Sequence, residues 1–237
     1  MSLRAALQYR ERKPELMDDP RLAAPEHVRA LNALARINRV SGTVGTLWKA
    51  IRPLILRLSS QRLRVLDVGC GAGDVAVGLW QRSARCDRHL DIAACDISPV
   101  AIDDARRRAE SAGAHVRFFQ HDAMTPTPDD FDIVYSTLFL HHLGEKDAVR
   151  LLSSMRSRAR RMVLVSDLVR SRVGYALTWC GVRMLTRSLI VHTDGPLSVR
   201  ASFTEHEVLT LAHRAGLTPA TIARHWPRRF LLRWDTP

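Results

Sequence analysis

The sequence predicts an α/β fold built on a doubly wound, mostly parallel sheet of seven strands. Short apolar runs, which are typical of buried strands, alternate with amphipathic segments between residues 62 and 169. Three closely spaced glycines follow the first apolar run, as in a strand-to-helix turn that faces a ligand. Two strand-like segments, 218–226 and 228–235, end the chain and predict an antiparallel C-terminal hairpin beside five parallel strands.

The first 60 residues are expected to be mainly helical. Apolar residues recur every three or four positions in EHVRALNALARINRV (26–40), which predicts an amphipathic helix. TLWKAIRPLILRLSS (46–60) predicts a second helix, kinked near its proline. We therefore expect an N-terminal helical lid or cap over residues 1–60, followed by one main domain over residues 61–237.

Strands and helices are expected to alternate through the main domain. The strand candidates are 62–69, 90–97, 115–123, 131–143 and 160–169, and the helices between them are 72–84, 98–114 and 145–159. The apolar and basic segment 170–195 predicts a helical lid insertion over a pocket. A further helix is expected over 202–217, opened by a capping box of Thr204 and Glu207.

The composition is that of an ordinary globular protein. The chain has 237 residues, of which 46% are hydrophobic and 25% charged, enough for one sizeable core. No apolar run approaches the roughly 20 residues that a membrane span needs, and the N-terminus lacks the features of a secretion signal. The four cysteines show no paired spacing, so we expect a cytoplasmic protein.

The net charge of +12 allows two interpretations. A basic surface is typical of proteins that bind nucleic acid. Here nearly all of the positive charge is arginine, and it is scattered over short clusters such as 105–110, 156–161 and 227–233. That scatter favours solvated helix faces, so we expect no nucleic-acid partner.

The glycine spacing separates two classes of ligand. A dinucleotide loop has the pattern G-x-G-x-x-G, which places a pyrophosphate at a helix N-terminus. This chain has Gly69, Gly71 and Gly73, with Asp74 where the dinucleotide pattern requires its last glycine. Asp67 and Asp74 would repel a pyrophosphate and would suit an ammonium or sulfonium group. The pattern therefore favours a cationic ligand and argues against an NAD(P)-dependent dehydrogenase.

The motif VLDVGCGAGD resembles motif I of class I S-adenosylmethionine-dependent methyltransferases, which share a Rossmann-like fold. FDIVYSTLFLHHL is similar to the fourth-strand motif of the small-molecule branch related to ubiquinone and menaquinone biosynthesis methyltransferases. The resemblance implies S-adenosyl-L-methionine as cofactor, with Asp96 on the ribose and Asp122 on the adenine. The alternatives are a helix cap for Asp96 and a turn for Asp122. The cofactor-binding residues that it implies are Asp67, Gly69, Gly71, Gly73, Asp96, Ile97, Asp122, Ala123, Thr137 and Leu138.

The N-terminal stretch from ELMDDP to ALARINRVSG resembles a segment of bacterial methyltransferases from polyketide-type biosynthetic settings. From this we hypothesise that the helix near Arg39 closes over the carboxylate of the cofactor. An Arg39→Ala protein that binds S-adenosylmethionine as well as the parent would rule this out.

Methyl transfer to a phenol or enol benefits from a base near neutral pH, and histidine is the usual one. His141 and His142 follow the fourth strand and are the candidate catalytic residues, with helix capping or packing as the alternative. Asp167, Arg170 and His192 are candidate substrate-binding residues, with turn or cap roles as the alternative. We expect no metal site.

The function predicted is methyl transfer from S-adenosylmethionine to a small molecule, with O-methylation of an aromatic or polyketide-like secondary metabolite preferred. An RNA or DNA methyltransferase is the alternative, although the fourth strand lacks the D/N-P-P-Y/F motif of base-amino methylation. A dehydrogenase and a non-catalytic binding module are the remaining alternatives. The partners expected are the small-molecule acceptor and, as one open option, a second copy of the chain.

Overall fold

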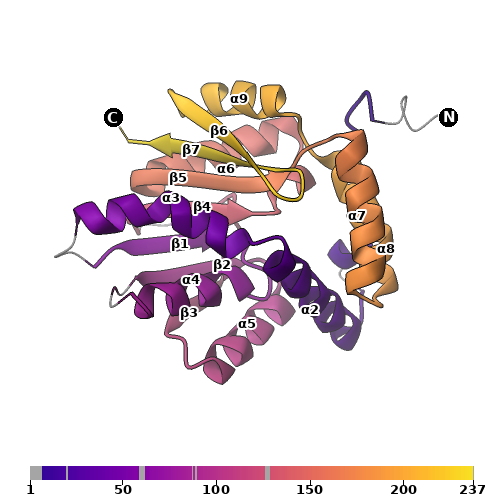
Figure 1. Cartoon of the computed structure of the whole chain (residues 1–237), viewed down its shortest axis with the longest axis horizontal. Coiled ribbons are helices and arrows are strands. Elements are labelled where there is room, and N and C mark those ends of the chain that lie inside the picture. The colour runs from indigo at the N-terminus through magenta and orange to yellow at the C-terminus, as the bar shows by residue number, and fades with distance from the viewer. Residues whose placement is uncertain are drawn as a thin grey trace.

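The computed structural model describes residues 7–19, 21–58, 62–86, 88, 90–125 and 129–236. Its seven-stranded sheet has the order β3-β2-β1-β4-β5-β7-β6 (Figure 1). Neighbours among the first five strands are parallel, and β7 is antiparallel to β5 and β6. The predicted fold class and C-terminal hairpin are confirmed. The strands are β1 Arg64–Val68, β2 Asp91–Asp96, β3 Val116–Gln120, β4 Phe131–Thr137, β5 Ala159–Leu168, β6 Ala220–His225 and β7 Arg229–Asp235.

The helices follow the predicted order, and their ends carry the expected caps. The hydroxyl of Ser98 accepts a hydrogen bond from the Ala101 amide at 3.2 Å. The capping box of Thr204 and Glu207 is confirmed. The helices are η1 Leu16–Asp18, α2 Ala24–Val40, α3 Thr43–Arg57, α4 Asp74–Ala84, α5 Pro99–Ser111, η2 Leu140–His142, α6 Glu145–Arg158, α7 Arg172–Leu185, α8 Leu189–Ala201 and α9 Glu205–Arg214.

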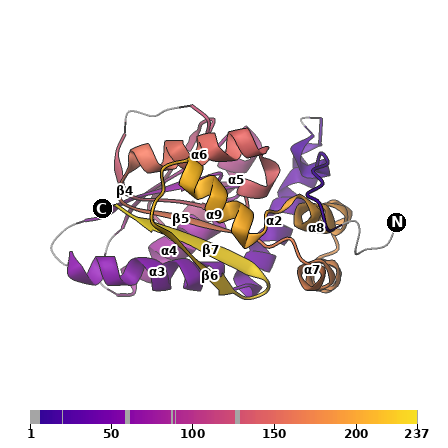
Figure 2. The ribbon, with the colours of Figure 1, turned by 90° about the horizontal axis from the view of Figure 1, so that it is seen from above.

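Helices cover both faces of the sheet, as a buried parallel sheet requires (Figure 2). On one face, apolar residues of α3, α4 and α5 pack against alternate residues of the strands. On the other, α6 and α9 pack against the intervening residues. Leu47 and Ile51 of α3 are fully buried in the first of these cores. This helix therefore packs as part of the main domain, although it lies within the predicted N-terminal cap.

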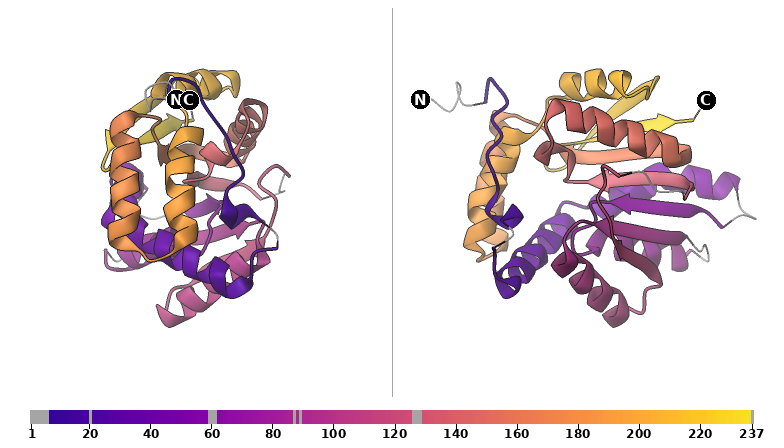
Figure 3. Two further views of the ribbon diagram at one scale, coloured as in Figure 1. Left: turned by 90° about the vertical axis from the view of Figure 1, so that its right-hand side faces the viewer. Right: turned by 180° about the vertical axis from the view of Figure 1, so that it is seen from behind.

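The carboxyl end of the sheet is covered by α2, by the pair α7 and α8, and by residues 7–19, which we call the N-terminal strap. The helices α7 and α8 lie side by side, and the strap runs along α8 (Figure 3). The carboxylate of Asp194 accepts hydrogen bonds from the Leu16 amide at 2.9 Å and the Met17 amide at 3.0 Å. The predicted helical insertion is thus a helical pair, and it extends to residue 201.

His192 and Asp194 lie inside α8, near the end of the segment predicted as the insertion. Gly195 and Pro196 also lie within this helix instead of ending it. A side chain at Gly195 would come within 2.9 Å of Val182, so glycine allows α7 and α8 to approach closely. In the part of the chain that the structure describes, no helix is long and apolar enough to cross a bilayer.

Candidate active site

The glycine loop joins β1 to α4 at the carboxyl end of the sheet. Gly69, Gly71 and Gly73 have φ values of +71°, +50° and +68°, a conformation that favours glycine. A Cβ at Gly69 would lie 2.8 Å from the ring of Phe139, so this ring packs directly on the loop backbone. At Gly71 the nearest atom to such a Cβ would be in Leu31 at 3.7 Å, an ordinary van der Waals contact, so α2 packs close to the loop here.

Asp67 lies at the base of this loop, within β1. The hydroxyl of Tyr135 donates a hydrogen bond to its Oδ2 at 2.8 Å. Its Oδ1 is buried and has no hydrogen-bond partner among the described residues. Burial raises the pKa of Asp67 to about 8. A buried acceptor without a donor is costly for the fold, and a cationic donor from a ligand would satisfy it.

Asp96 and Ile97 follow β2, the strand next to β1. The carboxylate of Asp96 accepts the Gly71 amide at 2.8 Å and the Ser98 amide at 3.0 Å, so it is fixed against the glycine loop. Its bond to the Ser98 amide partly matches the helix-cap role considered as the alternative. Asp96 nevertheless lies at the carboxyl end of the sheet, where a ligand is expected. Ile97 is 65% exposed, which is unusual for a large apolar side chain beside a polar loop.

Asp122 and Ala123 follow β3 at the same edge. Asp122 is exposed, and its Oδ1 accepts the Met124 amide at 2.9 Å in a local turn. Ala123 is buried in the core on the α6 side of the sheet. The turn predicted as the alternative for Asp122 is thus present, and it uses only one of the two carboxylate oxygens.

Three further predicted cofactor residues lie around this edge. Thr137 ends β4, and Leu138 has a φ of +53° that turns the chain toward η2. Arg39 is exposed near the C-terminal end of α2. Its neighbour Asn38 is buried and donates to Asp74 Oδ2 at 3.2 Å, just behind the glycine loop. A contact between Arg39 and the cofactor stays a prediction.

His141 is held by a buried carboxylate. Its Nδ1 lies 2.7 Å from Asp167 Oδ1, and its backbone amide donates to Asp167 Oδ2 at 3.0 Å. Both side chains are almost fully buried. Burial favours a higher pKa for Asp167, but its bonds from His141 and the backbone lower the pKa below its ordinary value. An ionised Asp167 accepts a hydrogen bond from Nδ1 of His141, so that Nε2 on the opposite side of the ring is available to another partner.

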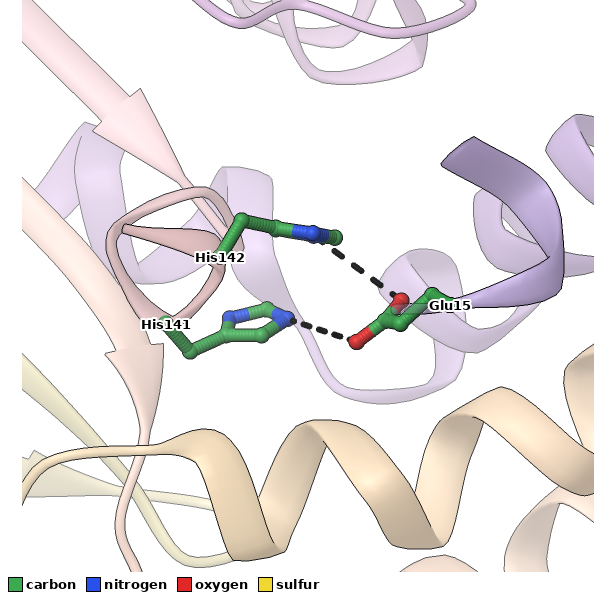
Figure 4. Close-up of side chains that lie close together, drawn as sticks. All are labelled: Glu15, His141 and His142. Atoms are coloured by element: carbon green, nitrogen blue, oxygen red, sulfur yellow. Dashed lines mark ion pairs between the residues drawn. The ribbon is translucent and has the colours of Figure 1, made fainter. Parts of the chain in front are cut away.

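His142 stands beside His141 and is held in the same way. Its Nδ1 lies 3.1 Å from Asp18 Oδ2 on the N-terminal strap. Glu15, also on the strap, faces both rings. Its Oε1 is 3.7 Å from Nε2 of His141, and its Oε2 is 3.9 Å from Nε2 of His142 (Figure 4). Although burial lowers it, the pKa of His142 is raised to about 9 by Asp18 and Glu15. We call these four residues, together with Asp167, the histidine cluster.

The other predicted substrate residues have different partners. Arg170 is buried, and it donates to both carboxylate oxygens of Glu207 at 2.9 and 2.7 Å and to the Ser202 carbonyl at 2.8 Å. It therefore joins the end of β5 to α9. His192 bonds the Thr186 carbonyl at 2.9 Å within the α7–α8 connection. Substrate binding by Arg170, His192 and Asp167 stays a prediction.

Glu15 and Asp18 are site residues that the sequence did not assign. The only signal was their place in ELMDDP, after a proline and ahead of an amphipathic helix. More than 120 residues separate this motif from the histidines, as the span of 124 residues between Asp18 and His142 shows. Nothing in the local pattern indicates that the two segments meet.

Comparison with known proteins identifies the class. A family model described as a methyltransferase domain matches residues 65–161. A demethylmenaquinone methyltransferase of Thermus thermophilus is 36% identical over 89 residues, which cover 37% of this chain and 38% of the relative. A magnesium-protoporphyrin O-methyltransferase of Rhodobacter capsulatus is 28% identical over 165 residues, which cover 68% of this chain and 71% of the relative.

A solved structure has the same fold. The magnesium protoporphyrin IX methyltransferase of Synechocystis PCC 6803, with bound S-adenosylhomocysteine, superposes with a TM-score of 0.60 at 18% identity. The match covers 89% of this chain and 98% of that one. Residues 65–161 therefore match a methyltransferase domain, and the chain is similar to class I S-adenosylmethionine-dependent methyltransferases, including enzymes of quinone biosynthesis.

The site fits the cofactor of this class, S-adenosylmethionine. The buried, unpaired Oδ1 of Asp67 suits an ammonium group, and the three glycines with positive φ allow a ligand to approach the loop backbone. The exposed Ile97 offers an apolar surface beside the fixed carboxylate of Asp96. A pyrophosphate would instead meet the carboxylates of Asp67 and Asp74.

Proposed function

We propose that this protein transfers the methyl group of S-adenosylmethionine to an oxygen of a small hydroxylated acceptor, of the aromatic or polyketide-like class. The observation that carries the proposal is the histidine cluster, an almost enclosed set of polar groups at the end of β4, next to the glycine loop. The relationship to a magnesium-protoporphyrin O-methyltransferase supports oxygen as the atom methylated.

On the cofactor side, the residues that would hold S-adenosylmethionine are those of the β1, β2 and β3 ends. Asp67 would receive the ammonium group, Asp96 the ribose hydroxyls, and Asp122 the adenine amino group. Ile97 and Ala123 would line the adenine. The carboxylates here bind by charge and hydrogen bonding, and the glycine loop allows the ligand to approach the backbone.

On the acceptor side, the chain must orient an oxygen in line with the methyl group and keep water out. When bound, S-adenosylmethionine would supply a methyl group on a sulfonium; the acceptor hydroxyl would pass its proton to Nε2 of His141 as the O–C bond forms and the C–S bond to the leaving S-adenosylhomocysteine breaks. His141 and His142 are the groups that would contact the acceptor oxygen and favour its deprotonated form. Asp167 is a positioning residue, because it fixes the ring of His141.

The enclosure of the cluster favours a small acceptor over a polymer. The side chain of His141 is 4% exposed, that of Glu15 10% and that of His142 23%. The N-terminal strap contributes Glu15 and Asp18, so it forms one wall of the acceptor site. A folded RNA reaches such a site only by extruding a base, which costs unstacking energy.

The test is an assay with competing acceptors. The full chain and S-adenosylmethionine are incubated with hydroxylated aromatic acids, hydroxyquinones and resorcinol-type polyketides, or with ribosomal and transfer RNA. We expect S-adenosylhomocysteine together with a small product heavier by one CH2 unit. Methyl incorporation into RNA, with every small acceptor untouched, would contradict the proposal in favour of a nucleic-acid methyltransferase.

The cellular compartment and the oligomeric state are two further parts of the proposal. All four cysteines are free thiols, which supports a reducing compartment such as the cytoplasm; cell fractionation tests this. A homodimer is the oligomeric form to be tested, by light scattering of the purified chain.

A further inference from the structure

Three potential metal ligands converge at the carboxyl end of β4. One ligand atom from each of Glu15, His141 and His142 lies within 4.8 Å of those of the other two (Figure 4). The separations of 3.7 and 3.9 Å between the Glu15 oxygens and the two Nε2 atoms are too long for hydrogen bonds. The three groups therefore face one another without bonding directly.

The opposite nitrogen of each ring is bound by a second carboxylate. Asp167 takes Nδ1 of His141 at 2.7 Å, and Asp18 takes Nδ1 of His142 at 3.1 Å. Metal-ligating histidines almost always bind a carboxylate, carbonyl or water through the ring nitrogen that is not on the metal. Here both histidines do so, and as a result both Nε2 atoms face the same carboxylate, Glu15.

The charges of the cluster also favour a cation. Three carboxylates surround two imidazoles, with Glu15 and Asp167 largely buried and Asp18 exposed at the rim. Two arginines of the N-terminal strap form hydrogen bonds to backbone carbonyls beside the cluster. Arg10 donates to the carbonyls of His141 and Leu143, and Arg12 donates to that of His142. Their positive charges therefore lie behind η2, at its carbonyls.

We propose that Glu15, His141 and His142 bind a first-row divalent transition-metal ion, with coordination positions left open for the acceptor oxygen. Two imidazoles and one carboxylate suit zinc, iron, cobalt or manganese better than magnesium or calcium, which prefer all-oxygen sets. Ligand atoms around one such ion lie about 3.3 Å apart, so a modest contraction of the cluster completes the site. The proposal replaces the expectation, from sequence, that the chain has no metal site.

The ion would account for how the acceptor oxygen is activated. A divalent ion acts as a Lewis acid and lowers the pKa of a bound hydroxyl group, whose proton then passes to solvent. With the ion in place, the histidines act as its ligands, and neither needs to take a proton. This catalytic role rests on the proposed function, whereas binding of the ion does not.

The experiment measures binding of Co²⁺ in the absence of acceptor and cofactor. The full chain, freed of any affinity tag and stripped with EDTA, is titrated with Co²⁺ and followed by visible absorption and calorimetry. We expect one site, and we expect Glu15→Gln to weaken it at least about tenfold. Glu11→Gln is the matched control, since Glu11 lies on the same strap but pairs with Lys13 and Arg200. It should bind Co²⁺ as the parent does.

Far-ultraviolet dichroism and S-adenosylhomocysteine binding show that each variant is folded. No Co²⁺ binding by the folded parent, or equal binding by Glu15→Gln, would overturn the metal site and leave methyl transfer as a separate question. If Co²⁺ binds but EDTA-stripped protein methylates its acceptor at the full rate, the catalytic role is overturned. Loss of transfer on stripping, restored by Co²⁺ or Zn²⁺, supports both parts.

Discussion

The glycine loop and the histidine cluster lie at the ends of neighbouring strands, β1 and β4, yet they are built in different ways. The loop is contiguous in sequence, and its shape is set by backbone conformation at three glycines. The cluster combines the N-terminal strap, η2 and the end of β5, and it depends on hydrogen bonds between side chains more than 120 residues apart in the longest case. Local motifs therefore specify the cofactor side, and tertiary packing specifies the acceptor side.

This difference fits the two tasks. Every methyltransferase of this class binds the same cofactor, so a fixed backbone cradle suffices. The acceptor varies between enzymes, and side chains supplied by a strap and a helical pair can change without altering the sheet.

The largest effect is expected at Arg170, which sequence assigned to the acceptor side. Its buried guanidinium pairs with Glu207, and removal of one partner of a buried ion pair costs about 3 kcal/mol or more. Arg170→Ala should lower the free energy of unfolding by that amount in urea titrations. Arg224→Ala is the control, because its pair with Glu205 is at the surface, and it should leave stability nearly unchanged. A normal stability with a raised KM would instead restore Arg170 to the acceptor site.

The glycine loop can be broken by adding one methyl group. Gly73→Ala forces a positive φ on alanine, and its Cβ would lie 2.6 Å from Phe118. Strain and overlap together should cost about 3 kcal/mol and abolish binding of S-adenosylhomocysteine. Gly113→Ala has a φ of +60° but open space around it, so strain alone should cost about 1 kcal/mol. Equal losses in the two variants would show that close packing at Gly73 does not matter.

The acceptor side is tested by Asp167→Asn, which keeps the shape of the side chain. The amide binds Nδ1 of His141 less well and no longer fixes its ring. We expect kcat to fall about 10- to 100-fold and the affinity for S-adenosylhomocysteine to stay as in the parent. Steady-state kinetics and calorimetry measure the two quantities. A loss confined to cofactor affinity would move Asp167 to the cofactor side.

The smallest effect concerns a single proton at Asp67. Its pKa, raised from 3.8 to about 8 by burial, means that the folded protein holds this proton at neutral pH. The stability it contributes is full below about pH 4 and is lost as the pH rises through 8. An ammonium group beside Oδ1 favours the ionised form. Binding of S-adenosylhomocysteine at pH 7 should therefore release a proton.

Calorimetry in buffers of different ionisation enthalpy measures that release. Affinity should also rise between pH 6 and pH 8, by at most about tenfold per unit. Asp67→Asn should release no proton. Proton uptake on binding by the parent would contradict this account of Asp67.

The elements that sequence predicted well are those with local signals. Strand and helix order, the hairpin and the capping box follow from periodicity and from short motifs. The helical insertion was expected to end at residue 195, because glycine and proline usually end helices; α8 instead continues to Ala201, and Gly195 allows close packing against α7. Arg170 was assigned to substrate because it follows a strand end, a pattern that does not show its partner Glu207 on α9.

The histidine cluster marks the limit of prediction from sequence. His141 and His142 could be identified by their position after β4, but their carboxylate partners could not. Glu15 and Asp18 meet them because the N-terminal strap runs along α8, where Asp194 binds it, and because Arg10 and Arg12 of the strap donate to the carbonyls of residues 141–143. That path depends on tertiary contacts that leave no periodic signal in the strap.

The central claim is that the glycine loop and the histidine cluster are two sides of one active site. A crystal structure with S-adenosylhomocysteine tests it most directly. We predict the ribose on Asp96, the amino group beside Asp67 and the sulfur facing His141 and His142 across a space for the acceptor. A ligand bound away from the glycine loop, or packed protein side chains between its sulfur and the two histidines, would contradict the claim.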